Sequence, residues 1–254
     1  MNHQSTPAAT AVSQPPGGPA QLTNMRLGMT TMLDCQDAGD GSPRLALLYG
    51  PSGYGKSVAA AHIAAHFRAA YVEAKSIWTQ RTLLEAIAHE LGIAKLERTG
   101  PRLLAQIIDH LLYDPVPIIV DEMDHLVKKQ SVEIIRDIHD AARVPILMIG
   151  EEALPAKLKA WDRFDNRILV ATPAQPSSIE DALLLRDHYC TRAHVADDLV
   201  EAITAVTKGV TRRIVVNLQK AQTAAIAEGA ARIDLARWGD RSFATGALPT
   251  RRAA

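Results

Sequence analysis

The chain has 254 residues, of which 47% are hydrophobic and 22% charged, an ordinary balance for a globular protein with one large or two modest domains. Its 28 basic and 28 acidic residues cancel, so no global basic field indicates nucleic-acid binding, although a local basic surface remains open. The sequence has no apolar run of membrane-spanning length and no secretion signal, and Cys35 and Cys190 lack metal-ligand or redox spacing. We therefore expect a cytoplasmic protein with free thiols and no membrane association.

The N-terminal part leads from a low-complexity tail to a buried strand. Residues 1–20 are rich in Pro, Gly, Ser, Thr, Gln and Ala, which predicts a disordered tail. A polar loop is expected at 36–43 and a short buried strand at 45–49. Between tail and loop, helical spacing of apolar residues predicts a short helix carried by Leu22, Met25, Met29 and Leu33.

Residues 50–57 match the phosphate-loop pattern G-x-x-x-x-G-K-[ST] at every fixed position. A predicted strand precedes them and an Ala-rich helix follows, which a chance Gly-rich turn would not explain. Glycines let successive N–H groups point at phosphates, and the helix N-terminus adds partial positive charge. Lys56 is expected to reach the β- and γ-phosphates, and the Ser57 hydroxyl to hold Mg²⁺. The predicted nucleotide-binding residues here are Gly50, Pro51, Ser52, Gly53, Tyr54, Gly55, Lys56, Ser57 and Val58.

Strands and helices alternate through the middle of the chain. Further strands are expected at 70–73, 117–120, 144–149 and 167–171. Helices are expected at 82–91, 101–112, 131–142 and 154–161. This alternation predicts an α/β fold with a mostly parallel five-stranded sheet that is covered on both faces.

Beyond the Pro-bounded segment 172–176 the pattern becomes purely helical. Helices are expected at 177–190, 197–208 and 211–228, the last with Thr211 as its N-cap. The predicted organisation is a tail (1–20), an α/β core with an N-terminal linker helix (21–172), a helical region (173–240) and a basic flexible tail (241–254).

An acidic pair, Asp121-Glu122, ends the predicted strand at 117–120. In a phosphate-loop protein, the acid at the strand end holds Mg²⁺, usually through water, so Asp121 is the candidate metal residue. A following glutamate can orient and deprotonate the attacking water, which makes Glu122 the candidate catalytic base. Acidic pairs often follow strands, but this pair together with the phosphate loop predicts Mg²⁺-dependent ATP hydrolysis.

The phosphate loop, the acidic pair and the helical region together resemble the AAA+ ATPases over roughly residues 22–229. The resemblance implies a five-stranded core, a helical lid, and ATP at the boundary between subunits of an oligomer. It further implies a γ-phosphate sensor at Glu151, an arginine that reaches the neighbouring ATP, and a phosphate-sensing arginine, Arg212. Arg167 is favoured over Arg163 for the inter-subunit role.

These further positions have simpler interpretations. AAA+ proteins usually carry Asn or Thr where this chain has Glu151, and a carboxylate is repelled by phosphate oxygens, so the hydrolysis rate stays open and an acidic surface turn fits equally well. Either arginine of the 163–167 segment can instead pair with Asp162 or Asp165. Arg212 lies in the first turn of a predicted helix, where a cation opposes the helix dipole unless an anion binds; a solvated basic turn is the alternative.

Four blocks narrow the resemblance to the target-selecting transposition ATPases of Mu-type bacteriophages: residues 47–57, 120–124, 163–168 and 209–213. In that family ATP drives assembly of a homo-oligomer on double-stranded DNA without strong sequence preference, as a helical filament or ring. The assembly delivers target DNA to a transposase, and ATP hydrolysis disassembles the oligomer.

DNA contact is the least determined part of this expectation. The Mu-type protein carries a DNA-binding module before its ATPase core, whereas here only the stretch up to Leu33 precedes the core. Contact is therefore expected from the core and the basic tail, with Lys128 and Lys129 as candidates and a solvated charge pair as the default. A protein-remodelling ATPase of the helicase-loader or secretion type, and a nucleotide-gated scaffold with little hydrolysis, remain alternatives.

Overall fold

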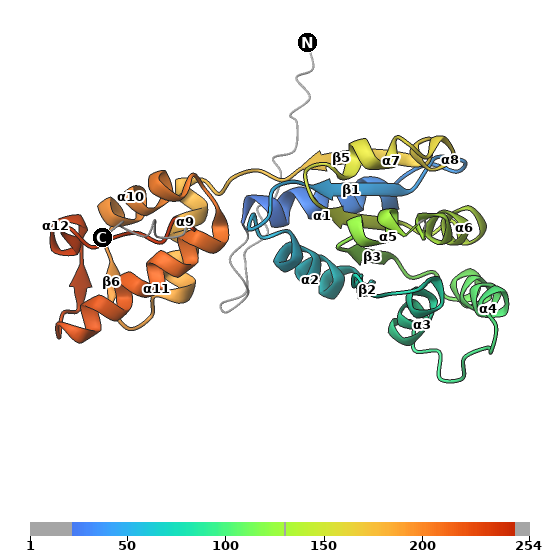
Figure 1. The fold of residues 1–254 in the computed structure, drawn as a ribbon, viewed down its shortest axis with the longest axis horizontal. Coiled ribbons are helices and arrows are strands. Elements are labelled where there is room, and N and C mark those ends of the chain that lie inside the picture. Colours follow the sequence, from blue (N-terminus) through green and yellow to red (C-terminus); the bar gives the residue numbers. More distant parts are fainter. Residues whose placement is uncertain (1–21, 130, 247–254) are drawn as a thin grey trace, which may run out of the picture.

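A parallel sheet of five strands organises the computed structural model, which describes residues 22–129 and 131–246 (Figure 1). The predicted tail at 1–20 and the last residues of the predicted basic tail, 247–254, lie outside the described residues. The strands run in the order β2-β3-β4-β1-β5, and every neighbouring pair is parallel. Their bounds are Leu45–Tyr49 (β1), Ala70–Glu73 (β2), Ile118–Asp121 (β3), Ile146–Gly150 (β4) and Ile168–Pro173 (β5). The predicted α/β fold with a five-stranded parallel sheet is confirmed.

Helices cover both faces of the sheet, because strand residues alternate between two apolar clusters. On β1, Ala46 and Leu48 belong to the cluster that α1 and α2 cover, whereas Leu45 and Leu47 belong to the cluster that α3, α4 and α6 cover. The helices of this part are α1 (Thr23–Gln36), α2 (Lys56–Phe67), α3 (Gln80–Glu90), α4 (Gly100–Tyr113), α5 (Asp124–Lys128), α6 (Val132–Ala142), α7 (Leu154–Leu158) and α8 (Asp162–Asp165).

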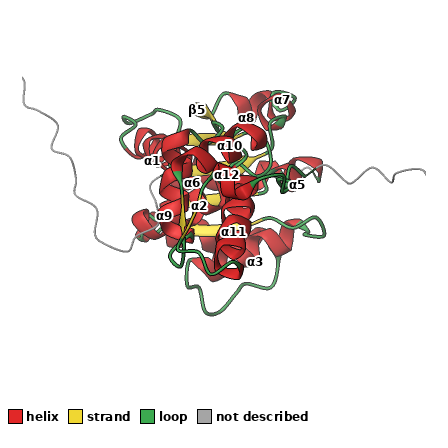
Figure 2. Ribbon diagram, turned by 90° about the vertical axis from the view of Figure 1, so that its left-hand side faces the viewer, coloured by secondary structure: helices red, strands yellow, loops and turns green. Residues whose placement is uncertain are grey.

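Residues 177–246 form a second layer, which we call the C-terminal helical unit. It contains α9 (Ile179–Tyr189), α10 (Asp197–Thr207), α11 (Thr211–Ala227) and α12 (Leu235–Trp238). The expectation of a purely helical pattern was wrong in one respect, since β6 (His194–Val195) and β7 (Arg232–Ile233) form a small parallel ladder. Figure 2, which faces this unit, shows α10, α11 and α12 in front of the strands.

The helical unit and the sheet share one apolar cluster. Leu22 and Met25 of the α1 region belong to the same buried cluster as Leu185 of α9 and Leu218 of α11. The unit is therefore packed onto the N-terminal edge of α1 rather than merely tethered through the chain after β5. Within the described residues, none of the helices combines the length and apolar character needed to cross a membrane.

Candidate nucleotide site

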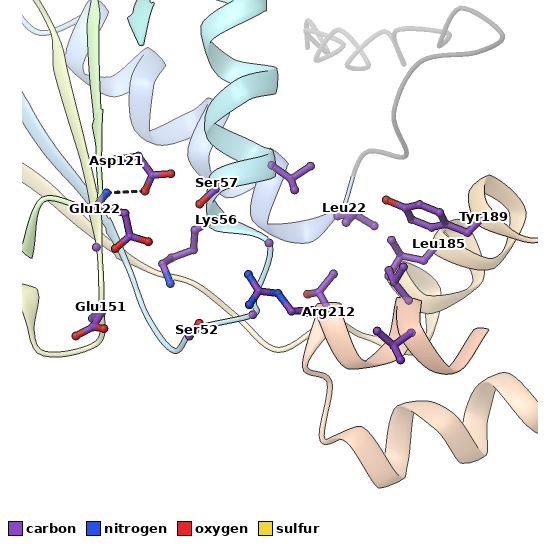
Figure 3. Close-up of a pocket in the computed structure, with 17 residues that line it drawn as sticks. Leu22, Ser52, Lys56, Ser57, Asp121, Glu122, Glu151, Leu185, Tyr189 and Arg212 are labelled. Atoms are coloured by element: carbon purple, nitrogen blue, oxygen red, sulfur yellow. Dashed lines mark hydrogen bonds between the residues drawn. The ribbon is translucent and has the colours of Figure 1, made fainter. Parts of the chain in front are cut away.

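A cavity of about 320 Å³ lies between the phosphate loop, the ends of β3 and β4, and the helical unit. Parallel strands end at the same edge of a sheet, so the segments that follow β1, β3 and β4 meet there. Figure 3 shows the side chains that line it. Of the sequence-predicted residues, it is lined by Ser52, Gly53, Gly55, Lys56, Ser57, Val58, Asp121, Glu122, Glu151 and Arg212.

Glycines set the path of the phosphate loop. Gly53 and Gly55 have φ values of +86° and +79°, in the left-handed region that side chains disfavour. A Cβ on Gly53 would lie 2.9 Å from Cγ1 of Val210, so the loop approaches the helical unit closely. The backbone N–H of Arg212 donates to the Gly53 carbonyl at 3.0 Å, which joins the loop to α11.

The Lys56 side chain folds back onto the start of the phosphate loop. Its Nζ lies 2.7 Å from the Gly50 carbonyl oxygen and 3.0 Å from that of Pro51. Burial lowers the pKa of Lys56, while the negative charges of Asp121 and Glu122 oppose that shift. The ammonium is thus poised beside the loop amides, where it can neutralise phosphate oxygens.

Asp121 is held in one orientation by two donors. The side chain is buried, Tyr71 Oη donates to Oδ2 at 3.1 Å, and the N–H of Glu122 donates to Oδ1 at 2.8 Å. Burial and the charge of Asp121 raise the pKa of Tyr71, so the phenol stays protonated and remains a donor. Tyr71 is a site residue that the sequence did not indicate, because its proximity to Asp121 depends on the pairing of β2 with β3.

Ser57 and Asp121 both line the cavity and offer the oxygen ligands that Mg²⁺ prefers. Among residues 22–129 and 131–246, no group of three or more His, Cys, Asp or Glu side chains could hold a metal ion. Magnesium usually keeps few protein ligands and completes its shell with water and substrate phosphates, which suits a hydroxyl and one carboxylate. The donor set therefore fits Mg²⁺ that arrives with a nucleotide.

A buried carboxylate anchors the end of β4, where Glu151 follows the strand. Asp124 is 2% exposed; its Oδ2 accepts the N–H of Glu151 at 2.7 Å, and its Oδ1 accepts Lys157 Nζ at 2.5 Å. The same Nζ lies 3.7 Å from Oε2 of Glu151. Glu151 thus has a neighbouring cation that reduces the negative potential at this end of the cavity. Sequence reasoning missed both Asp124 and Lys157.

The opposite end of the cavity is apolar. Figure 3 shows Leu22, Leu185 and Tyr189 gathered beside the helical unit, away from Lys56 and Asp121. An apolar end and a cationic, amide-rich end match the two halves of a nucleotide. The apolar lining comprises Leu22, Val58, Leu185, Tyr189, Val215 and Val216. Of these, sequence reasoning placed only Val58 in the nucleotide site.

The three candidate arginines differ in placement. Arg212 lies in the first turn of α11 and points toward the phosphate loop (Figure 3). Arg167 forms a forked ion pair with Asp140, with Nε at 3.1 Å from both carboxylate oxygens and Nη2 at 2.9 Å from Oδ2. That partner differs from Asp162 and Asp165, which the sequence suggested. Arg163 is exposed.

Two further expectations concern the lysines at the end of α5 and the first residue of α11. Lys128 and Lys129 are exposed at the end of α5, and Lys129 Nζ donates to the Trp78 carbonyl at 2.8 Å, which ties α5 to the loop after β2. Thr211 is not the N-cap of α11, because Val210 takes that position. The Thr211 hydroxyl instead lies 2.7 Å from Oγ of Ser177, in a buried contact that fixes the start of α11 to the chain after β5.

Comparison with known proteins finds a family match within the core. Residues 39–158 match the family model described as an AAA domain. This segment, which holds the phosphate loop and the acidic pair, is similar to AAA domains. A search of curated proteins finds no match.

Solved structures of AAA+ proteins share this fold. The ORC2 protein of Aeropyrum pernix in its ADP form has a TM-score of 0.67 at 16% identity, covering 86% of this chain and 67% of that one. The A. pernix ORC1 protein in complex with DNA has a TM-score of 0.60 at 21% identity, covering 86% and 63%. Cdc6p of Pyrobaculum aerophilum has a TM-score of 0.61 at 17% identity, covering 87% and 66%. The chain spans about two thirds of the length of each of these proteins, and at such identities the likeness concerns the fold. None of these matches is specific to transposition ATPases.

Proposed function

We propose that this AAA-type ATPase hydrolyses ATP with Mg²⁺ and assembles on double-stranded DNA, without strong sequence preference, to deliver that DNA to a transposase. The observation that carries the proposal is the cavity itself. Lys56, Ser57, Asp121 and Glu122 line one end of it, and Arg212 of the helical unit reaches in from the other side. A nucleotide bound between the sheet and the helical unit would fix the position of the helical unit, which would then act as a lid. Nucleotide binding would therefore control the surface that each subunit presents to its neighbour.

The chemistry follows from the residues at the polar end. The loop amides and Lys56 bind the phosphates and neutralise charge that develops during phosphoryl transfer. Glu122 orients a water and accepts its proton. Ser57 and Asp121 would hold Mg²⁺, and the ion would supply further charge neutralisation at the phosphates. Arg212 contacts phosphate oxygens from the helical unit.

In this proposal Arg163 is the arginine that contacts the ATP bound to the neighbouring subunit. Arg167 is occupied by its forked contact with Asp140, whereas Arg163 is exposed at the start of the segment. An exposed guanidinium stays charged and can bind phosphate oxygens of a neighbouring subunit bidentately. We therefore favour Arg163 for the inter-subunit role, whereas the sequence analysis favoured Arg167.

DNA binding is supported by charge rather than by a reading module. Lys128 and Lys129 lie exposed after the strand that carries Asp121, and a modest basic surface repeated in each subunit suffices for backbone binding by a polymer. The A. pernix ORC1 protein, which shares the fold, is known in complex with DNA. A chain with zero net charge is compatible with this mode because repetition multiplies weak contacts.

One observation favours a second candidate, a nucleotide-gated scaffold with little hydrolysis. Glu151 lines the cavity with its side chain 63% exposed, and a carboxylate there opposes the approach of phosphate oxygens. Lys157 offsets this charge only in part, since it is shared with Asp124. Measured turnover separates the candidates: a scaffold would bind ATP and release phosphate at background rate.

The DNA part of the proposal is tested by duplex binding of the wild type and the Lys128→Ala/Lys129→Ala double variant. Fluorescence anisotropy with two duplexes of unrelated sequence and with ATP should show similar affinities for the wild type. The double variant should bind roughly tenfold more weakly, with a salt slope smaller by about two, because each lysine removed eliminates about one phosphate contact.

A matched control keeps the change in charge constant. Lys95 and Lys159 are exposed lysines on other segments, so Lys95→Ala/Lys159→Ala should leave duplex binding unchanged. Equal weakening in both double variants would assign the effect to net charge and contradict a contact at α5. Wild-type binding that is indifferent to ATP, or no binding at all, would favour a protein-remodelling ATPase.

A further inference from the structure

The start of α1 is a junction of three segments that are distant in sequence. Asn24 is 5% exposed, and its Nδ2 donates to the Tyr54 carbonyl at 2.8 Å and to the Gln175 carbonyl at 2.7 Å. Its Oδ1 accepts the N–H of Gln175 at 2.8 Å. One buried amide therefore connects the phosphate loop, which carries Tyr54, with the chain that runs from β5 to the helical unit, which carries Gln175.

The neighbours of Asn24 extend this junction into the cavity and the helical unit. Leu22 lines the apolar end of the cavity. The N–H and Oγ1 of Thr23 lie 2.9 and 3.1 Å from Oδ1 of Asp181, a buried residue whose other oxygen accepts the N–H of Ser178 at the start of α9. The first turn of α1 is thus bonded to the loop, to the connecting chain and to the first helix of the unit.

We propose that Asn24 is a positioning residue that couples the phosphate loop to the helical unit, so that a nucleotide in the loop also fixes the placement of α9. The proposal rests on nucleotide binding by the cavity, which is part of the proposed function. Tyr54 lies between Gly53 and Gly55, the two left-handed residues of the loop, so restraining its carbonyl restrains the loop. Movement of the loop is transmitted to Gln175 through the same rigid side chain.

An amide is needed at this position for a chemical reason. Two carbonyl oxygens and one N–H converge on the side chain, which requires two donors and one acceptor. A carboxylate of the same shape would face both carbonyl oxygens without a proton to donate. Asn24→Asp therefore keeps the volume and one hydrogen bond while it breaks the two bonds that join the segments.

The test compares wild type, Asn24→Asp and the control Thr31→Val. Thr31 is on the same helix, is 2% exposed, and bonds to Oγ1 of Thr172 at 2.7 Å, away from the loop. Affinities for a fluorescent ATP analogue are measured by anisotropy, and amide hydrogen exchange in α9 is followed with and without ATP. We expect wild type and Thr31→Val to gain protection in α9 on binding ATP. Asn24→Asp should bind roughly tenfold more weakly and gain no protection in α9 even at saturating ATP.

A second variant keeps the proposal testable if Asn24→Asp fails to fold. In that case Asn24→Ser, which retains one donor, is used instead, and it should show the same loss of ATP-induced protection in α9. A wild type that binds ATP, with an Asn24 variant that matches it in affinity and in protection of α9, would overturn the positioning role alone. A wild type that does not bind ATP would overturn the proposed function and the coupling that depends on it.

Discussion

Glu122, the proposed catalytic base, has an unfavourable backbone conformation. Its φ of +54° places it in the left-handed region, which typically costs a residue with a side chain about 1–3 kcal/mol. The N–H of the same residue donates to Asp121, so the conformation turns the backbone toward one acid while the side chain lines the cavity. Strain of this kind persists where the surrounding structure imposes it, as the end of a buried strand does here.

Glu122→Gln should retain ATP binding and lose hydrolysis. The amide preserves the shape but cannot accept the proton of the attacking water, so turnover should fall by about 10²- to 10⁴-fold. Phosphate release and ATP affinity measured together check this. Glu152→Gln changes an exposed carboxylate beyond the cavity and should turn over like wild type. Unchanged turnover in Glu122→Gln would refute its role as the base.

Arg163 and Arg167 should respond differently to substitution. Arg167→Ala breaks the forked pair with Asp140, which is partly exposed, and should lower the free energy of unfolding by about 0.5–1 kcal/mol. Arg163→Ala should leave stability unchanged and reduce turnover of the assembled protein.

Mixing subunits tests the inter-subunit role itself. Arg163→Ala subunits combined with Lys56→Ala subunits should recover part of the turnover, because each supplies what the other lacks at a shared boundary. Recovery with Arg167→Ala in place of Arg163→Ala would restore the preference drawn from the sequence. No recovery with either arginine variant would contradict an inter-subunit role for both arginines.

The sequence predicted those site residues that follow one another along the chain. The phosphate loop is a linear pattern, and an acidic pair directly after an apolar strand is visible without a structure. Tyr71, Asp124 and Lys157 carry no such pattern, because their proximity to the site depends on which strands pair and how the chain turns after them. The partner of Arg167 was missed for the same reason.

Among elements, long periodic helices were predicted well and short ones were not. The helix at the start of the core extends to Gln36, and Leu33, one of the apolar residues whose spacing predicted it, is 42% exposed. The spacing of apolar residues also did not predict that Asn24 is buried, because that pattern takes only apolar side chains into account. The missed elements are short, with too few residues to reveal a period: α5, α8, α12, β6 and β7.

Helix α6 contributes a pH-dependent part of the stability. His139 is fully buried; its Nε2 accepts the N–H of Arg44 at 3.1 Å, and its Nδ1 lies 3.0 Å from Asp140. Burial lowers the pKa of His139 below its ordinary 6.5, although Asp140 opposes this. Below about pH 6.5 the unfolded chain therefore binds a proton that the native state does not, and stability falls as pH falls.

Denaturant unfolding at pH 7 and pH 5 measures this effect. Wild type should be less stable at pH 5. His139→Gln, which removes the titrating group, should be less stable than wild type at pH 7 and should lose less on acidification. An equal loss in both proteins would place the pH dependence elsewhere. The pKa of Asp140 is lowered despite burial, mainly by its bonds with Arg167 and His139, so its own contribution is lost only at a more acidic pH.

At the scale of the whole molecule, the nucleotide cavity is the joint between two layers. One apolar cluster connects the face of the sheet with α9 and α11, and polar contacts through Asn24, Thr23 and Arg212 surround the cavity. A ligand that bridges the layers would stabilise one relative placement of them, by as much as it binds that placement more tightly. In an oligomer with ATP at the subunit boundary, this placement would decide whether neighbours fit together.

Sedimentation velocity with and without duplex DNA, in ATP or ADP, tests most directly whether ATP in this cavity controls assembly on DNA. We predict a large assembly only when ATP and duplex are both present. Glu122→Gln should hold that assembly for longer than wild type, and Lys56→Ala should form none. Discrete rings that form equally with and without DNA, or assemblies that ignore the nucleotide, would contradict the account.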